Sequence, residues 1–410
     1  MTLDIDARSR IAPPAPVIPA RRTANIRYAV RDVVLLAQEA AATGREMLYL
    51  NIGDPNLFGF APPEHLVEAV HEAMRRNRNG YAPSSGVPEA LEAVAREADA
   101  KGIMGIRHIF ITTGASEAID LALSAVADPG DNVLTPSPGY PLYTAVLARL
   151  GIENRTYALD EAAEWQPDVE DVAARINGRT RAIVVINPNN PTGSVASAET
   201  MGALLDVAVE NDVVVFSDEI YDKLLLDGRV PTATASLRDN AKVVTFNGLS
   251  KSYVVPGWRI GWGIVSGPEG VMDDYCEAIQ KMERARLSAN HPEQYAIRPA
   301  LEGSQAHLGP MTEVLTRRRD ITVRRLNAID GISCVPPAGA FYAFPRIDLG
   351  VADQEFVRRA IRDTGVVIVP GSGFGQMPGS NHFRVVFLPP EEVLERAFDG
   401  IAEVAASCRS

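Results

Sequence analysis

The sequence predicts an α/β protein, with a large, mostly parallel sheet flanked by helices and a second, smaller α+β domain. Apolar segments without alternation, such as Ala-Ile-Val-Val-Ile at 182–186, suit strands that are buried on both faces of a parallel sheet. Helical segments alternate with these strands, as successive βαβ units require. Apolar residues make up 46% and charged residues 22% of the 410 residues, a balance typical of a folded globular chain.

The predicted elements alternate regularly along the first two thirds of the chain. The strands there are 48–52, 109–113, 132–135, 181–186, 212–217 and 242–246, with helices at 117–127, 141–150 and 198–210. After Gly261 come long helices at 269–287 and 311–328, short strands near 341–344, 366–369 and 383–387, and a last helix at 390–406. We therefore predict a flexible, proline-rich arm at 1–28, small-domain segments at 29–60 and 296–410, and a large domain at 61–295.

Charge and reactive side chains argue against several classes of function. With 40 Lys and Arg against 52 Asp and Glu, the formal net charge is −12, which disfavours nucleic acid or an anionic membrane as the main partner. The three cysteines lack CxxC spacing and the six histidines form no HxxxH or HExxH pair, so neither a disulfide framework nor a metal site is supported. No apolar run approaches the roughly 18 residues of a membrane span. These observations predict a cytoplasmic protein without a metal.

Small and polar residues gather where the predicted strands end, which is where doubly wound sheets bind ligands. Gly-Ala-Ser at 114–116 follows strand 109–113 and opens a helix, an arrangement that offers free N–H groups to a phosphate. An ordinary turn with a serine cap has the same pattern. The loop 187–193 (Asn-Pro-Asn-Asn-Pro-Thr-Gly) can fix an amide toward a site or be a structural turn. Asp218, directly after an apolar strand, is either a helix cap or the partner of a buried cation.

The strongest indication of chemistry is the segment 248–261, Gly-Leu-Ser-Lys-Ser-Tyr-Val-Val-Pro-Gly-Trp-Arg-Ile-Gly. Lys251 lies among small and apolar residues, where the pKa of its amine can fall as a Schiff-base lysine requires. Arg259 lies between Gly257 and Gly261, so it can approach a phosphate closely. Most lysines are solvated surface charges, but this one follows a strand and its neighbours have little reason to be exposed.

Together these segments resemble the class I aminotransferases, fold-type I enzymes that use pyridoxal 5′-phosphate (PLP). The lysine segment, the loop 187–193 and Ser-Asp-Glu-Ile-Tyr at 217–221 occur in the family's order, and the resemblance extends from about Tyr49 to the C-terminus. Four segments look most like microbial alanine aminotransferases, namely 51–60, 217–223, 246–253 and 286–292. The resemblance implies a homodimer whose large domain binds PLP and which exchanges an amino group between alanine and a 2-oxo acid, commonly 2-oxoglutarate or pyruvate.

The resemblance also implies roles for individual residues. Lys251 would form the Schiff base and then move the proton, Asp218 would pair with the pyridinium nitrogen, and Tyr140 would stack on the ring. The implied cofactor-binding residues are Tyr81 (reaching the neighbouring subunit), Ala115, Ser116, Tyr140, Asn190, Asp218, Tyr221, Ser250, Lys251 and Arg259. The implied substrate-binding residues are Gly53, Asn190 and Arg384, the last gripping the α-carboxylate. Arg27, with Arg286 as a second candidate, is our hypothesis for the group that recognises the distal carboxylate of glutamate.

Two positions depart from the pattern of some relatives, and several functions remain open. The stacking aromatic is Tyr140 rather than the tryptophan of some aspartate-specific members. Many relatives carry Ser or Thr three residues before the lysine, where this chain has Gly248, so Ser250 takes part of that phosphate contact or the contact is missing. The amino acid could be aspartate, valine, an aromatic or a precursor of a specialised metabolite. A different reaction on the same fold is also open, because carbon–sulfur lyases and aminocyclopropane-forming synthases share the lysine, aspartate and arginine of this site. A PLP-binding transcription regulator would need a DNA-binding domain, for which the arm 1–28 leaves no room.

Overall fold

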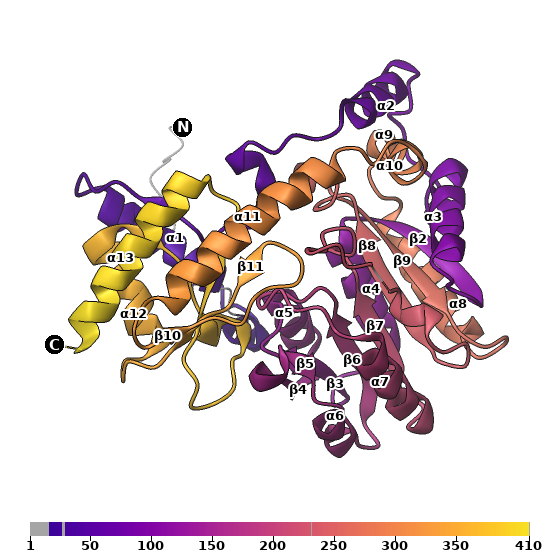
Figure 1. Cartoon of the computed structure of the whole chain (residues 1–410). Coiled ribbons are helices and arrows are strands. Elements are labelled where there is room, and N and C mark those ends of the chain that lie inside the picture. The colour runs from indigo at the N-terminus through magenta and orange to yellow at the C-terminus, as the bar shows by residue number, and fades with distance from the viewer. Residues whose placement is uncertain (1–15, 27–28, 231, 410) are drawn as a thin grey trace, which may run out of the picture.

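The computed structural model describes residues 16–26, 29–230 and 232–409, and the elements fall into two groups (Figure 1). One is a central sheet with helices on both faces. The other surrounds the long helices α11 (Leu308–Asn327) and α13 (Glu391–Arg409), which lie side by side at the opposite end of the molecule. Of the predicted arm, residues 21–25 form the 3₁₀ helix η1 (Arg21–Asn25) beside α5 (Pro141–Leu150). The division into domains stays a prediction.

The central sheet has eight strands within the described ranges. In spatial order they are β2 (Ile106–Thr113), β9 (Ile260–Ser266), β8 (Val243–Gly248), β7 (Val214–Asp218), β6 (Thr180–Ile186), β3 (Asn132–Ser137), β4 (Glu153–Asp160) and β5 (Gln166–Pro167). From β8 to β4 all neighbours are parallel, whereas β9 runs antiparallel to both β8 and β2. Strand β2 therefore points the same way as β8, and the carboxyl ends of β2, β3, β6, β7 and β8 share one edge. The predicted mostly parallel sheet is confirmed.

Helices cover both faces of this sheet because successive strand residues point to opposite sides. Phe110 packs in one buried cluster with residues of α4, α5 and α8, whereas its neighbour Ile111 belongs to the cluster on the other face. Besides α5, the helices of this group are α2 (Glu64–Arg75), α3 (Pro88–Ala100), α4 (Ala115–Val126), α6 (Val169–Arg175), α7 (Ala198–Glu210), α8 (Asp273–Arg286), α9 (His291–Gln294) and α10 (Ile297–Glu302). Burial on both faces explains why the strand sequences lack alternation.

The second group joins an N-terminal segment to the C-terminal third of the chain. Strand β1 (Leu48–Tyr49) pairs in parallel with β13 (Val366–Val367), so residues far apart in sequence share one small sheet. The other elements are α1 (Ala29–Ala41), β10 (Ile332–Ser333), β11 (Tyr342–Ala343), β12 (Arg346–Ile347), α12 (Asp353–Arg359), β14 (Val369–Pro370) and β15 (Phe383–Val386). Short 3₁₀ or π turns are η2 (Pro55–Phe58), η3 (Glu161–Ala163), η4 (Thr234–Ser236), η5 (Pro256–Trp258), η6 (Ala360–Thr364) and η7 (Gly371–Phe374).

Three strands of the central sheet, β4, β5 and β9, were not among the predicted elements. The sequence of β9 is Ile-Gly-Trp-Gly-Ile-Val-Ser, and its glycines hide the usual strand pattern. Both glycines are required by close packing: a Cβ on Gly261 would collide with the backbone N of Ala115, and one on Gly263 would collide with the Phe110 ring. The antiparallel strand is thus specified by contacts with β2 and α4 that no local pattern shows.

Candidate active site

The carboxyl edge of the sheet borders a cavity of about 790 Å³, which also touches the second group of elements. Eleven of the fourteen residues for which the sequence predicts a cofactor or substrate role line this cavity. They are Gly53, Ala115, Ser116, Tyr140, Asn190, Asp218, Tyr221, Ser250, Lys251, Arg259 and Arg384. The parallel strands bring nine of them together, because the loops that follow β2, β3, β6, β7 and β8 all leave the sheet at this edge, whereas Gly53 and Arg384 come from the second group.

Lys251 follows strand β8 and its amine points at the backbone of Gly53. Its Nζ donates a hydrogen bond to the Gly53 carbonyl oxygen over 3.0 Å, and the side chain is largely enclosed. Burial lowers the pKa of Lys251 to about 8, and the positive charges of Arg384 and Arg259 act in the same direction against the opposing charge of Asp54. With a pKa of about 8, roughly a tenth of this amine is deprotonated at pH 7, and the deprotonated form is the one that a nucleophile or proton acceptor requires.

Asp218 is the last residue of β7 and is buried against the cavity wall. Its Oδ2 accepts a hydrogen bond from the hydroxyl of Tyr143 over 3.2 Å, and its Oδ1 accepts one from the backbone N–H of Ile220 over 3.3 Å. Burial raises the pKa of Asp218 to about 6, although both hydrogen bonds favour the carboxylate. Among the residues that the structure describes, no cation forms an ion pair with it. A buried carboxylate in this position favours a ligand that carries positive charge.

The start of α4 has the features of an anion-binding site. The helix begins at Ala115 with Gly114 as its N-cap, and no side chain caps it, so its first N–H groups and the positive end of its dipole face the cavity. Gly114 has φ +75°, and a Cβ there would collide with the guanidinium of Arg259. Arg259 itself adopts a left-handed conformation with φ +54°, and its Nη1 donates to the Pro256 carbonyl oxygen over 3.1 Å. Glycine and arginine therefore fit together beside the helix terminus.

Arg384, on strand β15 of the second group, presents a buried guanidinium to the cavity. Its Nη1 donates to Oδ1 of Asn190 over 3.1 Å, and its Nη2 donates to the carbonyl oxygen of Asn51 over 2.6 Å. The guanidinium lies over the rings of Tyr342 and Phe374, with its Cζ 4.6 Å from each ring centroid. These contacts hold a flat, two-pronged donor in one orientation, the geometry that suits a carboxylate.

Two tyrosines of the site were not among the predicted site residues. Tyr342, on β11, lines the cavity and its hydroxyl lies 2.9 Å from that of Tyr221. It also explains Gly53, since a Cβ at that glycine would collide with the Tyr342 hydroxyl. Tyr143, one turn into α5 from Tyr140, holds Asp218. The sequence signal for Tyr143 was its position three residues after Tyr140, because residues three apart lie on the same face of a helix. The only sequence signal for Tyr342 was its position in a short strand that is rich in aromatic residues.

Two predicted positions, Tyr81 and Arg286, do not line the cavity of their own chain. Tyr81 is 82% exposed and does not line the cavity of its own chain. Arg286 does not line it either, because its Nη2 is bound by the carbonyl oxygens of Ser84 and Ile111, at 3.1 and 2.6 Å. We therefore withdraw Arg286 as a substrate-binding candidate within its own subunit. Arg27 lies outside the described residues.

The departure at Gly248 has a local explanation. A Cβ at this position would lie 2.7 Å from the carbonyl oxygen of Ile260 and 3.0 Å from the Cα of Gly261, so strands β8 and β9 pack too closely for a side chain here. Ser250, two residues on, does line the cavity.

Within the described part of the chain, no group of three or more His, Cys, Asp or Glu side chains is arranged to hold a metal ion. None of the described helices is both long and apolar enough to cross a membrane.

The fold and this site define a fold-type I transferase, and comparisons with known proteins place it further. Residues 45–401 match the family model for aminotransferase class I and II. The glutamate-pyruvate aminotransferase AlaA of Haemophilus influenzae is 39% identical over 94% of this chain and 96% of its own length. The alanine aminotransferase of Mycobacterium tuberculosis is 38% identical, covering 94% and 92% of the two chains. The chain belongs to the class I and II aminotransferases.

Solved structures agree with this assignment. The alanine aminotransferase from Pyrococcus furiosus superimposes with a TM-score of 0.91 at 40% sequence identity, covering 95% of this chain and 100% of that one. The predicted fold-type I architecture and the predicted resemblance to aminotransferases are both confirmed.

Proposed function

We propose that this protein is a PLP-dependent aminotransferase that exchanges an amino group between L-alanine and a 2-oxo acid, with 2-oxoglutarate as the acceptor from alanine and pyruvate as the acceptor in the reverse direction. The relatives named above carry that activity in their names and cover nearly the whole chain. We further propose that it acts as a cytoplasmic homodimer in which Tyr81 reaches the neighbouring active site. The exposed position of Tyr81 suits this role.

The donor set of the cavity fits PLP, which combines an aldehyde, a phosphate and a basic ring nitrogen. Lys251 supplies an amine with a lowered pKa, and the α4 terminus with Arg259 supplies an anion site. The observation that carries the proposal is Asp218, a buried carboxylate without a described cation partner that faces the same cavity. A protonated ring nitrogen would provide the missing positive charge. Ser250 would contribute to the phosphate site, and Tyr140 would stack on the ring.

The chain's own residues then divide the work of transamination. When bound, PLP supplies an electron sink that makes the substrate Cα–H acidic. Lys251, whose amine has a pKa of about 8, would take the proton from Cα and deliver it to C4′ of the cofactor. Arg384 would hold the substrate α-carboxylate in a bidentate fork, in place of its present bonds, with Asn190 and the backbone of Gly53 completing the grip. Tyr221 and Asn190 would donate to the phenolic oxygen of the cofactor.

The cavity wall suits a small, uncharged substrate side chain. Its cationic side chains among the described residues are Lys251, Arg259 and Arg384, and each already has a role above. Apolar residues supply much of the remaining wall, among them Leu35, Ile52 and Ile220. The distal carboxylate of glutamate therefore needs a donor from outside this set, and we propose Arg27. Replacing Arg27 by Ala should raise the Michaelis constants for glutamate and 2-oxoglutarate but not for alanine, and unchanged constants would remove it.

The proposal is tested by the absorbance spectrum of the purified protein, before and after L-alanine is added without any oxo acid. We expect the visible band of PLP joined to Lys251 to fall, the shorter-wavelength band of the aminated cofactor to rise, and pyruvate to appear. A visible band that L-alanine leaves unchanged would refute alanine as substrate and direct the test to aspartate, valine and aromatic amino acids. The absence of any such band after PLP is added would refute the cofactor assignment.

A further inference from the structure

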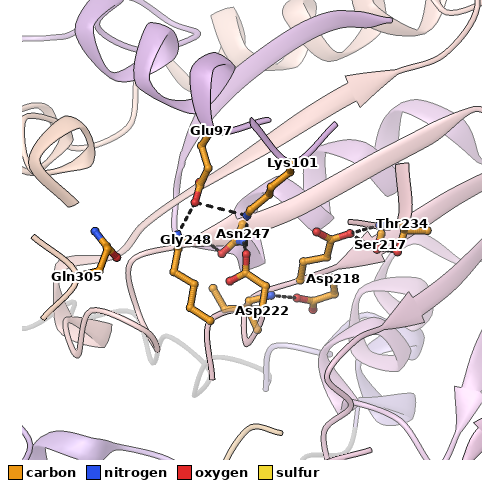
Figure 2. A network of polar contacts seen from close by, with 12 residues as sticks. Glu97, Lys101, Ser217, Asp218, Asp222, Thr234, Asn247, Gly248 and Gln305 are labelled. Carbon is orange, nitrogen blue, oxygen red and sulfur yellow. Dashed lines mark hydrogen bonds and ion pairs between the residues drawn. The ribbon is translucent and has the colours of Figure 1, made fainter. Parts of the chain in front are cut away.

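A cluster of buried charges lies behind the segments that carry Asp218 and Lys251 (Figure 2). Lys101, the C-cap residue of α3, places its Nζ 2.5 Å from Oδ2 of Asp222 and 3.5 Å from Oε1 of Glu97. Glu97 also binds the amine of Lys223 over 2.6 Å. The Asp222 side chain is only 6% exposed and that of Lys101 is 21% exposed, so this ion pair is poorly screened by solvent.

The cluster is connected to both segments of the proposed cofactor site. Asn247, near the end of β8, donates from Nδ2 to the same Oδ2 of Asp222 over 3.0 Å. Its Oδ1 accepts the backbone N–H of Gly248 over 2.7 Å, three residues before Lys251. Asp222 directly follows Tyr221. One carboxylate oxygen thus joins the turn after β7 to the strand end that leads to the lysine.

The turn after β7 presents its residues alternately to the two sides. Asp218 and Tyr221 line the cavity, whereas Glu219 and Asp222 point away from it. Glu219 is anchored by the hydroxyl of Ser217 over 2.9 Å and by the backbone N–H of Thr234 over 3.0 Å. Asp222 has no comparable anchor: its Oδ1 is buried without a hydrogen-bond partner among the described residues. Its position therefore depends on Lys101 and Asn247.

Charge balance makes Lys101 the critical member of the cluster. Three carboxylates, those of Glu97, Glu219 and Asp222, surround its ammonium, and only Lys223 offers a second described cation nearby. Burial opposes the charge on Lys101, but these three carboxylates outweigh burial and raise the pKa of the amine above its ordinary value. Lys101 therefore stays charged throughout the working pH range. Without it, Asp222 would be a buried charge held only by an amide, and such groups move toward water.

We propose that Lys101 is a positioning residue for the cofactor site, because it fixes Asp222 and thereby holds the turn carrying Asp218 and Tyr221 against the strand end leading to Lys251. This inference rests on the proposed PLP-dependent function. Lys101 itself touches neither cavity nor substrate. Its replacement should disturb the ring side of the site, formed by Asp218, Tyr221 and Lys251, and leave the anion site at the start of α4 intact.

Two probes separate these sides of the site in the apoprotein. The experiment titrates wild type and Lys101→Met with PLP and, separately, with inorganic phosphate, and follows intrinsic fluorescence. We expect Lys101→Met to bind PLP more weakly by on the order of tenfold, and phosphate within about twofold of wild type. Lys101→Arg keeps the charge and should recover most of the PLP affinity. The double variant Lys101→Met/Asp222→Asn should lose less than the sum of the two single losses, because both act through one ion pair.

Lys242→Met is the matched control. Lys242 precedes the same strand, β8, at its other end and pairs with Asp212 over 2.7 Å, so this variant removes a lysine ion pair remote from the cavity. It should leave both affinities unchanged. If Lys101→Met does not fold, Lys101→Gln replaces it, because glutamine keeps a hydrogen-bond donor without the charge. The affinities of Lys101→Gln for PLP and for phosphate then test the positioning role.

The outcomes separate the inference from the function on which it rests. Wild-type PLP affinity in Lys101→Met, or an equal loss of PLP and phosphate affinity, would overturn the positioning role. Failure of the wild-type protein to bind PLP at all would instead refute the proposed function, and this inference with it.

Discussion

Replacing Asp218 by Asn should stabilise the apoprotein while weakening cofactor binding. In the folded chain burial raises the pKa of Asp218 from 3.8 to about 6, so the folded state holds a proton there that the unfolded state has already lost. Stability therefore falls as pH rises from about 4 to about 6, and stays lower above that range. A shift of about two pKa units corresponds to about 3 kcal/mol. The amide is nearly isosteric: its oxygen can accept the hydrogen bond from the backbone N–H of Ile220, and its NH2 group can donate to the hydroxyl oxygen of Tyr143.

Urea unfolding of the apoproteins at pH 8 and pH 5 measures both the size and the sign of this effect. At pH 8 the variant should exceed wild type by up to about 3 kcal/mol, and about half of that advantage should remain at pH 5. PLP affinity should move the opposite way, because the amide cannot neutralise a protonated ring nitrogen. A variant that is no more stable than wild type at pH 8, or one whose advantage is the same at both pH values, would refute the reasoning. Tyr143→Phe is the control: it keeps the carboxylate, removes one hydrogen bond, and should destabilise the apoprotein at pH 8.

Three further predictions test other parts of the site. Because the pKa of Lys251 is about 8, the rate at which PLP joins the apoprotein should rise with pH and level off just above pH 8; a rate still rising at pH 10 would contradict this. Gly114→Ala should weaken PLP affinity about tenfold or more, because its Cβ displaces Arg259 and its φ is left-handed, and fluorescence titration measures the change. Arg384→Lys should raise the Michaelis constant for alanine by about 10- to 100-fold without changing PLP affinity, since an ammonium cannot make the bidentate grip; steady-state kinetics showing an unchanged constant would exclude Arg384 from that role.

Much of the fold follows from local sequence, whereas the roles of most site residues were predicted from the family resemblance. Helices 141–150 and 198–210 were predicted with the bounds that the structure has, because each begins and ends at recognisable capping residues. The cavity residues were predictable for a related reason. In a parallel sheet every strand ends at the same edge, so a turn that follows an apolar strand already has its place, and Asp218 and Lys251 each follow such a strand.

Contacts between distant segments were decided only by the tertiary structure. Strand β9 was not predicted, because its glycines are required by the approach of Phe110 and Ala115 rather than by strand propensity. Tyr342 reaches the site from β11, and its role depends on Gly53, nearly three hundred residues earlier. Lys101 had the sequence features of any helix-terminal lysine.

The chemical groups of the site could therefore be predicted from the sequence, whereas the residues that hold those groups in place could not. A nucleophile or an anion site needs particular residue types next to a strand end. The sequence itself shows which residues directly follow a predicted strand. The groups that hold Asp218, Asp222 and Gly53 in place come from other elements, and their meaning is set by burial and distance, which only folding establishes.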